Sequence, residues 1–193
     1  MLINTLRLHS NPTINFLLTA IIGAVAIGLL SPVSIDVSAS LPVTLQTYIV
    51  ILVAFLLGWK AGTLATVLYV IAGAAGIPVF PGYTSGVERL TGLYGGFYFG
   101  FIMSALVCGY LAEASTAKTH LRNLMIWILG HLVVLLLGFA WQWQIVPPEG
   151  GWMAELKPLL PGMMIKVALG ILTVYAVGRL LQNSRQKQGT DNQ

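Results

Sequence analysis

The stretch PVTLQTYIVILVAFLLGWKAGTLATVLYVIAGAAGI, residues 42–77, carries the clearest information about the fold of this chain. It holds two apolar segments, at about 42–58 and 60–77, joined by little more than Gly58-Trp59-Lys60. Each segment approaches the length of about 20 residues with which a helix spans the hydrocarbon core of a bilayer. The stretch therefore predicts two membrane helices that are connected as a tight hairpin.

Four further apolar segments have a similar length. They lie at about 14–31, 92–113, 122–146 and 160–182. Hydrophobic residues make up 56% of the 193 residues and charged residues only 8%, which excludes an ordinary soluble domain. We expect an all-α integral membrane protein with six transmembrane helices, forming a single domain over residues 1–193 and ending in a polar, disordered tail at 185–193.

The distribution of lysine and arginine predicts the orientation in the membrane. Most of these residues fall on the side of the N-terminus, namely Arg7, Lys60, Lys118, Arg122, Arg179, Arg185 and Lys187. Arg89 and Lys157 fall on the other side. By the positive-inside rule, both termini are cytoplasmic. Because no basic stripe is present, the net charge of +4 reflects this orientation and indicates no nucleic-acid partner.

Three connections on the outward side are long and rich in proline, glycine or serine, at 31–41, 77–91 and 146–160. Connections of this length in a compact domain are typical of lids and ligand surfaces. The alternative is that they only join the helices.

Lys166 is the only charged residue well inside any of the six apolar segments. A lysine at bilayer depth costs about 2.5 to 3.5 kcal/mol on insertion scales, so its presence indicates a function. Pro161 and Gly162 predict that the sixth helix starts just before it, which would add free N–H groups and partial positive charge. Together with Met163 on the same helical face, Lys166 predicts an outward-facing pocket for a carboxylate. The alternative is a lysine that snorkels to the outer interface.

Other candidate ligand contacts lie near the outward ends of the segments. Arg89 is a cation that precedes a glycine-rich helix entry, and Tyr94, Phe97 and Tyr98 offer flat apolar faces to a ring. Thr44 and Gln46 place a hydroxyl and an amide just inside the second segment, where buried polar groups need partners. The alternatives are a solvated charge pair in the loop, aromatic side chains that face lipid, and capping of a helix by Thr44.

The first segment carries small residues at four-residue spacing, Ala20, Ala24 and Gly28. Such a stripe lets another helix approach closely in lipid, so it predicts a contact with a partner protein. Packing within this chain is the alternative, and spacing alone favours it slightly.

Catalytic patterns are missing from the sequence. It has no paired intramembrane carboxylates, no HExxH motif and no phosphate-binding loop. The single cysteine, Cys108, allows no intrachain disulfide and no zinc-type ligand set. His131 stands alone in the fifth segment, which is more typical of a hydrogen-bonded core histidine than of a catalyst. The sequence predicts no enzyme, no metal and no cofactor, so any energy coupling would come from a partner.

Several motifs, taken in this order, resemble the BioY family of biotin-specific S components of energy-coupling factor (ECF) transporters. They are Pro42-Val43-Thr44-Leu45-Gln46-Thr47, Leu57-Gly58 with Gly62 and Tyr69, Gly73-Ala74-Ala75-Gly76-Ile77-Pro78-Val79-Phe80, Gly92 with Gly95-Gly96-Phe97, and Leu160-Pro161-Gly162 with Lys166. Each motif is weak alone, and their joint order is specific.

The resemblance implies an S-component fold of six helices in the plasma (inner) membrane of a prokaryote, which binds biotin or a similar anionic vitamin from outside. It also implies a complex with a transmembrane T component and two ATPase subunits, with Ala20 and Ala24 matching the family's small-residue contact to the T component. Met163 stands where the family usually has an aspartate, which removes an acceptor for ureido N–H groups. The expected function is biotin import, and the alternatives are an S component for another carboxylated small molecule and an intramembrane enzyme or scaffold.

Overall fold

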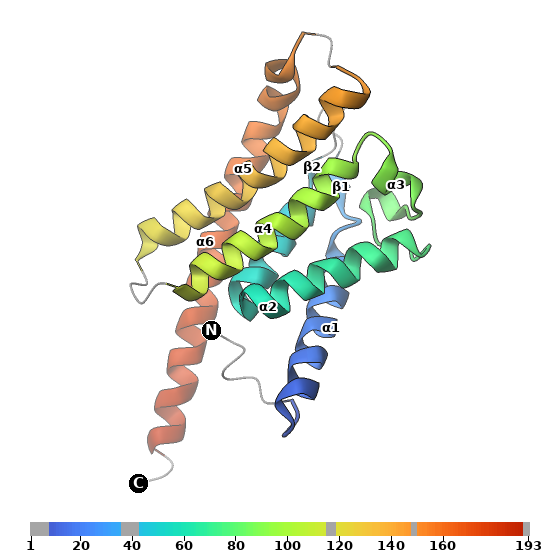
Figure 1. Cartoon of the computed structure of the whole chain (residues 1–193). Coiled ribbons are helices and arrows are strands. Elements are labelled where there is room, and N and C mark those ends of the chain that lie inside the picture. The colour runs from blue at the N-terminus through green and yellow to red at the C-terminus, as the bar shows by residue number, and fades with distance from the viewer. Residues whose placement is uncertain (1–7, 36–42, 115–118, 148–149, 191–193) are drawn as a thin grey trace.

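The computed structural model describes residues 8–35, 43–114, 119–147 and 150–190 of the chain (Figure 1). In this part of the chain, the helices long and apolar enough to cross a membrane are α1 (Pro12–Leu30), α2 (Gln46–Ala74), α4 (Gly95–Ala114), α5 (His120–Ile145) and α6 (Trp152–Thr190). The connections hold the short elements β1 (Ser34–Ile35), β2 (Val43–Thr44), η2 (Pro81–Tyr83) and α3 (Glu88–Thr91). Strands β1 and β2 pair antiparallel, with Ser34 opposite Thr44. The protein is thus a helical membrane bundle with a small folded cap.

Helix α2 contains two of the predicted spans, because the chain reverses direction within it. Gly58 has φ 84° and ψ 172°, a backbone conformation that glycine adopts without strain. The side-chain amide of Gln46 donates to the hydroxyl of Tyr69 at 2.5 Å. A straight helix would separate these two residues by roughly 35 Å at ~1.5 Å per residue. The predicted helical hairpin is therefore confirmed, with Gly58 as its turn, and Pro42 lies outside the described residues.

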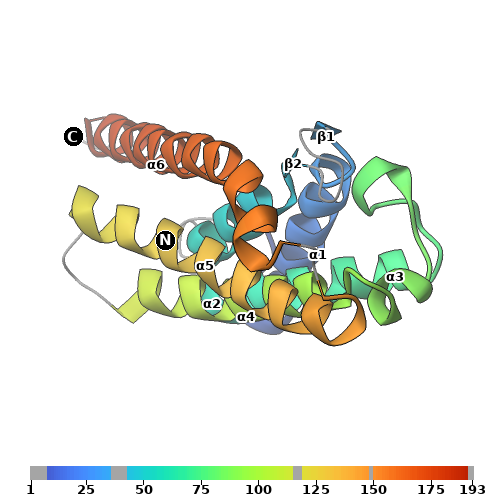
Figure 2. The ribbon, with the colours of Figure 1, turned by 90° about the horizontal axis from the view of Figure 1, so that it is seen from above.

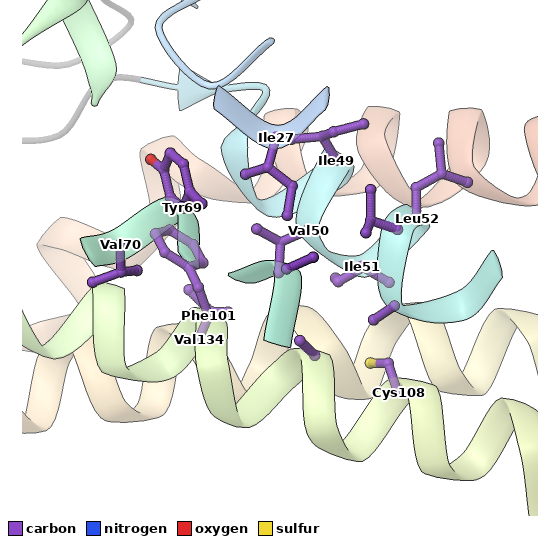
Figure 3. Packing of buried hydrophobic residues seen from close by; sticks show 14 of the residues in the cluster. Ile27, Ile49, Val50, Ile51, Leu52, Tyr69, Val70, Phe101, Cys108 and Val134 are labelled. Carbon is purple, nitrogen blue, oxygen red and sulfur yellow. The ribbon is translucent and has the colours of Figure 1, made fainter. Parts of the chain in front are cut away.

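The two arms of α2 pack tightly against each other and against α4. A methyl group built on Gly62 would lie 2.4 Å from Cα of Ala54 in the other arm, so only glycine fits without a shift. Val50 and Ile51 in the first arm are fully buried, and Figure 3 shows them within a cluster that includes Phe101 and Val134. The first arm of α2 is therefore the centre of the bundle.

Helix α1 begins at a capped end and packs its small residues against α2. The Asn11 side chain accepts hydrogen bonds from the backbone N–H groups of Thr13 at 2.9 Å and Ile14 at 3.4 Å. Ala20 is fully buried, and a methyl group on Gly28 would lie 3.1 Å from the Val79 side chain.

Ala20 and Gly28 of the predicted partner-binding stripe both face the interior of this chain, so the structure shows their internal packing, and the contact with a partner stays a prediction. Small residues permit close helix packing whichever helix is the neighbour, so their spacing could not distinguish the two cases. Ala24 is half-buried and packs at the edge of the core.

Helix α6 differs from its prediction at both ends. It starts at Trp152 and carries Pro158 and Pro161 in its interior, so Pro161 does not mark the helix start. Each proline leaves one carbonyl of the preceding turn without its helical donor, which this exposed end of the helix tolerates. The helix then continues through Thr190, where a disordered tail was expected from residue 185; its leucine, glutamine, arginine and lysine residues are good helix formers. Residues 191–193 lie outside the described chain.

Figure 2 shows α6 along one edge of the bundle, where it packs mainly against α5 and α2. The reversal of α2, the end of α4 and the end of α6 lie toward the lower left of Figure 1. The β1–β2 pair, α3 and the junction between α5 and α6 lie on the opposite side. The bundle therefore has one plain face and one face that carries the folded connections.

Candidate functional site

A cavity of about 330 Å³ lies beneath the folded connections, between the starts of α2 and α4, the middle of α5 and the first half of α6. Its lining in the described residues is Thr44, Gln46, Thr47, Pro81, Gly82, Thr84, Arg89, Tyr94, Phe97, Tyr98, Phe101, His131, Val134, Leu135, Leu159, Met163 and Lys166. All of the ligand contacts predicted from the sequence are among these residues. The structure thus brings together side chains from segments that are far apart in the chain.

Two cations line the cavity and come from different elements. Lys166 comes from α6 together with Met163, and Arg89 comes from α3 in the connection before α4. The described lining includes no aspartate or glutamate, so nothing in it neutralises the two charges. Opposite charges attract more strongly where water is partly excluded. The cavity is therefore suited to an anionic group.

The helix start does not add to this positive charge. Lys166 lies about 21 Å along α6 from Trp152, at ~1.5 Å per residue. The partial charge of a helix terminus acts only within the first turn or so. The prediction that free N–H groups of the helix start lie next to Lys166 is therefore wrong. The positive charge there comes from the ammonium group.

The polar wall at the start of α2 is held in place by the second arm of the same helix. Gln46 is buried and donates its amide N–H to Tyr69, whose ring contacts Phe80 edge-on at a centroid distance of 5.7 Å. Phe80 is fully buried and also lies 4.4 Å from the ring of Tyr98. This chain of contacts fixes the connection that carries Pro81, Gly82 and Thr84, so the connection is part of the cavity wall.

Helix α4 and the turn before it supply an aromatic wall. Tyr94, Phe97, Tyr98 and Phe101 recur at the three- and four-residue spacing that places side chains on one face of a helix. The Phe97 ring packs edge-on against Phe139 of α5 at 5.8 Å. Sequence reasoning selected the first three of these residues and missed Phe101, although the same spacing could have found it.

Helix α5 contributes His131, Val134 and Leu135, which the sequence analysis did not assign to a site. The expectation that His131 is a hydrogen-bonded core residue is confirmed, since its Nδ1 lies 2.9 Å from the carbonyl oxygen of Trp127. The same ring also borders the cavity. No local sequence pattern around His131 indicates that its ring borders the cavity, because this depends on how α5 packs against α4 and α6.

A shallower hollow continues from the cavity toward the surface. It shares Thr84, Arg89 and Tyr94 with the cavity, and the exposed Glu88 lies beside it. Arg89 therefore stands at the boundary between the cavity and the outer surface. Fold and site together define a polytopic helical membrane protein with a small-molecule cavity near one membrane face.

Comparisons with known proteins place the chain within this class. The family profile of the BioY family matches residues 5–183. A protein of Thermotoga maritima named biotin transporter BioY is 51% identical over 72 residues, which are 37% of this chain and 43% of that protein. A probable biotin transporter BioY of Pyrococcus horikoshii is 32% identical over 146 residues, which are 74% of this chain and 86% of the relative.

A crystal structure titled as the S-component for biotin from an ECF-type ABC transporter has the same fold. It superimposes with a TM-score of 0.75 and 20% identity, over 89% of this chain and 95% of that chain. The chain belongs to the BioY family.

Proposed function

We propose that this protein is the substrate-binding S subunit of an ECF-type vitamin uptake transporter and that its substrate is biotin. The observation that carries the proposal is the cavity, whose described lining combines two cations and no carboxylate with an aromatic wall in a member of the BioY family. Biotin offers a carboxylate, a polar ureido group and an apolar ring system. Each of these parts has a counterpart in the lining.

The residues fall into three groups by chemistry. Lys166 and Arg89 would bind the carboxylate and other polar oxygens, and Thr44 and Gln46 would add hydrogen bonds. Tyr94 and Phe97 would cover the ring system, with Met163 as an adaptable apolar neighbour. A cavity of about 330 Å³ falls at the small end of the ~300–1,000 Å³ typical of ligand pockets, which suits a vitamin of biotin's size.

The alternative is an S subunit for another carboxylated small molecule. The absence of a carboxylate from the described lining favours it, because a carboxylate at position 163 would accept from ureido N–H groups and methionine accepts only weakly. Both candidates share the anion site and differ in what binds the rest of the ligand.

The charge distribution supports an orientation with both termini in the cytoplasm and the cavity facing outward. Lys60 follows the reversal of α2, Arg122 lies in the first turn of α5, and Arg179 lies in the C-terminal third of α6. Arg7 and Lys118 lie outside the described residues. The membrane would be the plasma membrane of a prokaryote.

The partners would be a transmembrane T component and two ATPase subunits, which supply the energy for release of substrate to the inside. Of the proposed contact stripe, Ala24 alone keeps part of its surface accessible. The outer side of α1 next to it is apolar and exposed, including Ile21, Ile22 and Val25. Lipid or the T component would cover it.

Equilibrium binding of radiolabelled biotin to the purified protein in detergent tests the proposal. We expect saturable binding with one site per chain, and competition by unlabelled biotin. Competition by other carboxylated vitamins at equal concentration separates the two candidates. Absence of saturable biotin binding, together with binding of another carboxylate, would replace biotin by that ligand.

A further inference from the structure

His131 carries a buried nitrogen for which the described part of the chain provides no partner. The side chain is only 3% exposed and borders the cavity. Its Nδ1 lies 2.9 Å from the carbonyl oxygen of Trp127, one turn earlier in α5, and its Nε2 forms no hydrogen bond with any described residue. The great majority of buried polar atoms in proteins are paired. An unpaired one in a side chain that borders a cavity therefore points to a ligand.

The hydrogen bond to Trp127 determines what Nε2 can do. A carbonyl oxygen only accepts, so Nδ1 carries the hydrogen atom. In a neutral imidazole the other nitrogen is then an acceptor. Nε2 lies on the edge of the ring that is turned away from the backbone of α5. The free group is therefore a hydrogen-bond acceptor.

The charged side chains of the cavity offer no acceptor. Lys166 and Arg89 only donate, and no aspartate or glutamate is present in the described lining. The Thr84 hydroxyl donates to the carbonyl oxygen of Pro81 at 2.9 Å, so its position is already fixed. A ligand that brings N–H groups into this cavity needs acceptors. Gln46 offers its amide oxygen, because its amide N–H donates to Tyr69, and His131 offers Nε2, which has no hydrogen-bond partner among the described residues.

We propose that Nε2 of His131 accepts a hydrogen bond from a ring N–H of the ligand and thereby selects for a cyclic urea or amide head group. The inference rests on the proposed function, since biotin supplies such N–H groups from its ureido ring. It assigns to α5 a binding residue in addition to Lys166 and Met163 of α6. The anion site alone would accept any small carboxylate, whereas His131 distinguishes ligands by their donors.

Two substitutions of His131 separate binding from structure. In His131→Asn the side-chain amide lies near the place of Nδ1, so it can still donate to Trp127 and offers nothing at Nε2. In His131→Gln the amide reaches the place of Nε2 and can still accept from the ligand. Each variant is measured with biotin and with biotin methylated on one or the other ureido nitrogen.

We expect His131→Asn to lower the affinity for biotin about tenfold, the worth of a buried hydrogen bond, and His131→Gln to retain most of it. For the methylated biotin that has lost the relevant N–H, His131→Asn should change the affinity less than about twofold, because the bond is already gone. Thermal unfolding without ligand is measured for all proteins to compare their folding.

Unchanged biotin affinity in His131→Asn would overturn the inference, as would an equal loss for biotin and both methylated ligands. Biotin binding by the wild-type protein remains the test of the proposed function. If the wild type binds biotin and His131→Asn binds it with the same affinity, only the role of His131 is rejected. A wild type that does not bind biotin would reject both.

Discussion

Helix α2 and the apolar part of α6, Trp152–Leu180, are both 29 residues long and have nearly equal hydropathy, yet their surroundings are opposite. Within the most apolar window, 67% of α2 is buried inside the protein and only 11% of α6. Hydropathy reports that a segment can enter a bilayer, and it does not report whether protein or lipid covers it. The difference in burial arises from the reversal at Gly58, which folds α2 on itself so that the other helices can surround it.

The two helices consequently have different roles. The first arm of α2 forms the centre of the core, and its packing holds the bundle together. Helix α6 contributes little to that core but brings Lys166 and Met163 to the cavity. Substitutions in α2 should therefore act on stability, and substitutions on the cavity side of α6 should act on binding.

The largest expected effect is on stability, from Gly62→Ala in α2. The added methyl group would lie 2.4 Å from Cα of Ala54, and backbone atoms cannot give way as a flexible side chain can. We expect a loss of about 3 kcal/mol in the free energy of unfolding, measured by denaturant titration in detergent. Gly178→Ala in α6 is the matched control, because a methyl group there meets nothing within 4 Å. Equal effects of the two substitutions would mean that the tight contact between the arms of α2 does not exist.

The next effect is on binding, from Lys166→Met in α6. Removing the ammonium should lower biotin affinity by roughly 10- to 100-fold, as for loss of a hydrogen bond to a charged group, while the folded yield stays the same. The control is Lys157→Met, which removes an exposed lysine of the same helix that does not line the cavity. Equilibrium binding of radiolabelled biotin measures both. If Lys166→Met binds biotin as the wild type does, Lys166 only reaches toward the membrane interface.

A smaller effect, in the direction of tighter binding, is expected from Met163→Asp. The carboxylate would lie one helical turn before Lys166, where it can accept from ureido N–H groups of the ligand. We expect about tenfold tighter binding of biotin and no gain for biotin methylated on both ureido nitrogens. Met163→Leu serves as the apolar control. An equal gain for both ligands would show that the acid acts on Lys166 and not on the ureido group.

The sequence was sufficient to predict the elements with strong local signals. The two apolar arms around Gly58 and the lysine within the last segment are visible without any structure, because composition and glycine placement determine them. The start of α6 was not predictable in this way, since Pro161 is compatible both with a first turn and with the interior of an exposed helix.

Tertiary contacts account for the remaining differences. Ala20 and Gly28 pack against this chain's own residues, and their small size fits an external partner equally well. His131 reaches the cavity only because α5 crosses between α4 and α6. A sequence pattern read one segment at a time contains no information on such crossings.

The smallest expected effect concerns a hydrogen bond between α2 and α6. The hydroxyl groups of Tyr48 in α2 and Thr173 in α6 lie 2.8 Å apart. Thr173 also donates to the carbonyl oxygen of Leu169 at 2.8 Å, so Tyr48 must be the donor in the bond between the helices. We expect a coupling energy of about 0.6 kcal/mol between Tyr48→Phe and Thr173→Val, the average for such bonds in membrane proteins.

A double-mutant cycle of the free energy of unfolding in detergent measures this coupling, and Thr173→Ser, which keeps the hydroxyl, should remain close to the wild type. A coupling near zero would indicate that α6 is attached only by apolar packing, such as the contact of Gly170 with the ring of Trp127. A value well above 1 kcal/mol would instead make α6 part of the cooperative core. In that case the low burial of α6 would be a poor guide to its contribution to stability, and the division between a structural α2 and a binding α6 would not hold.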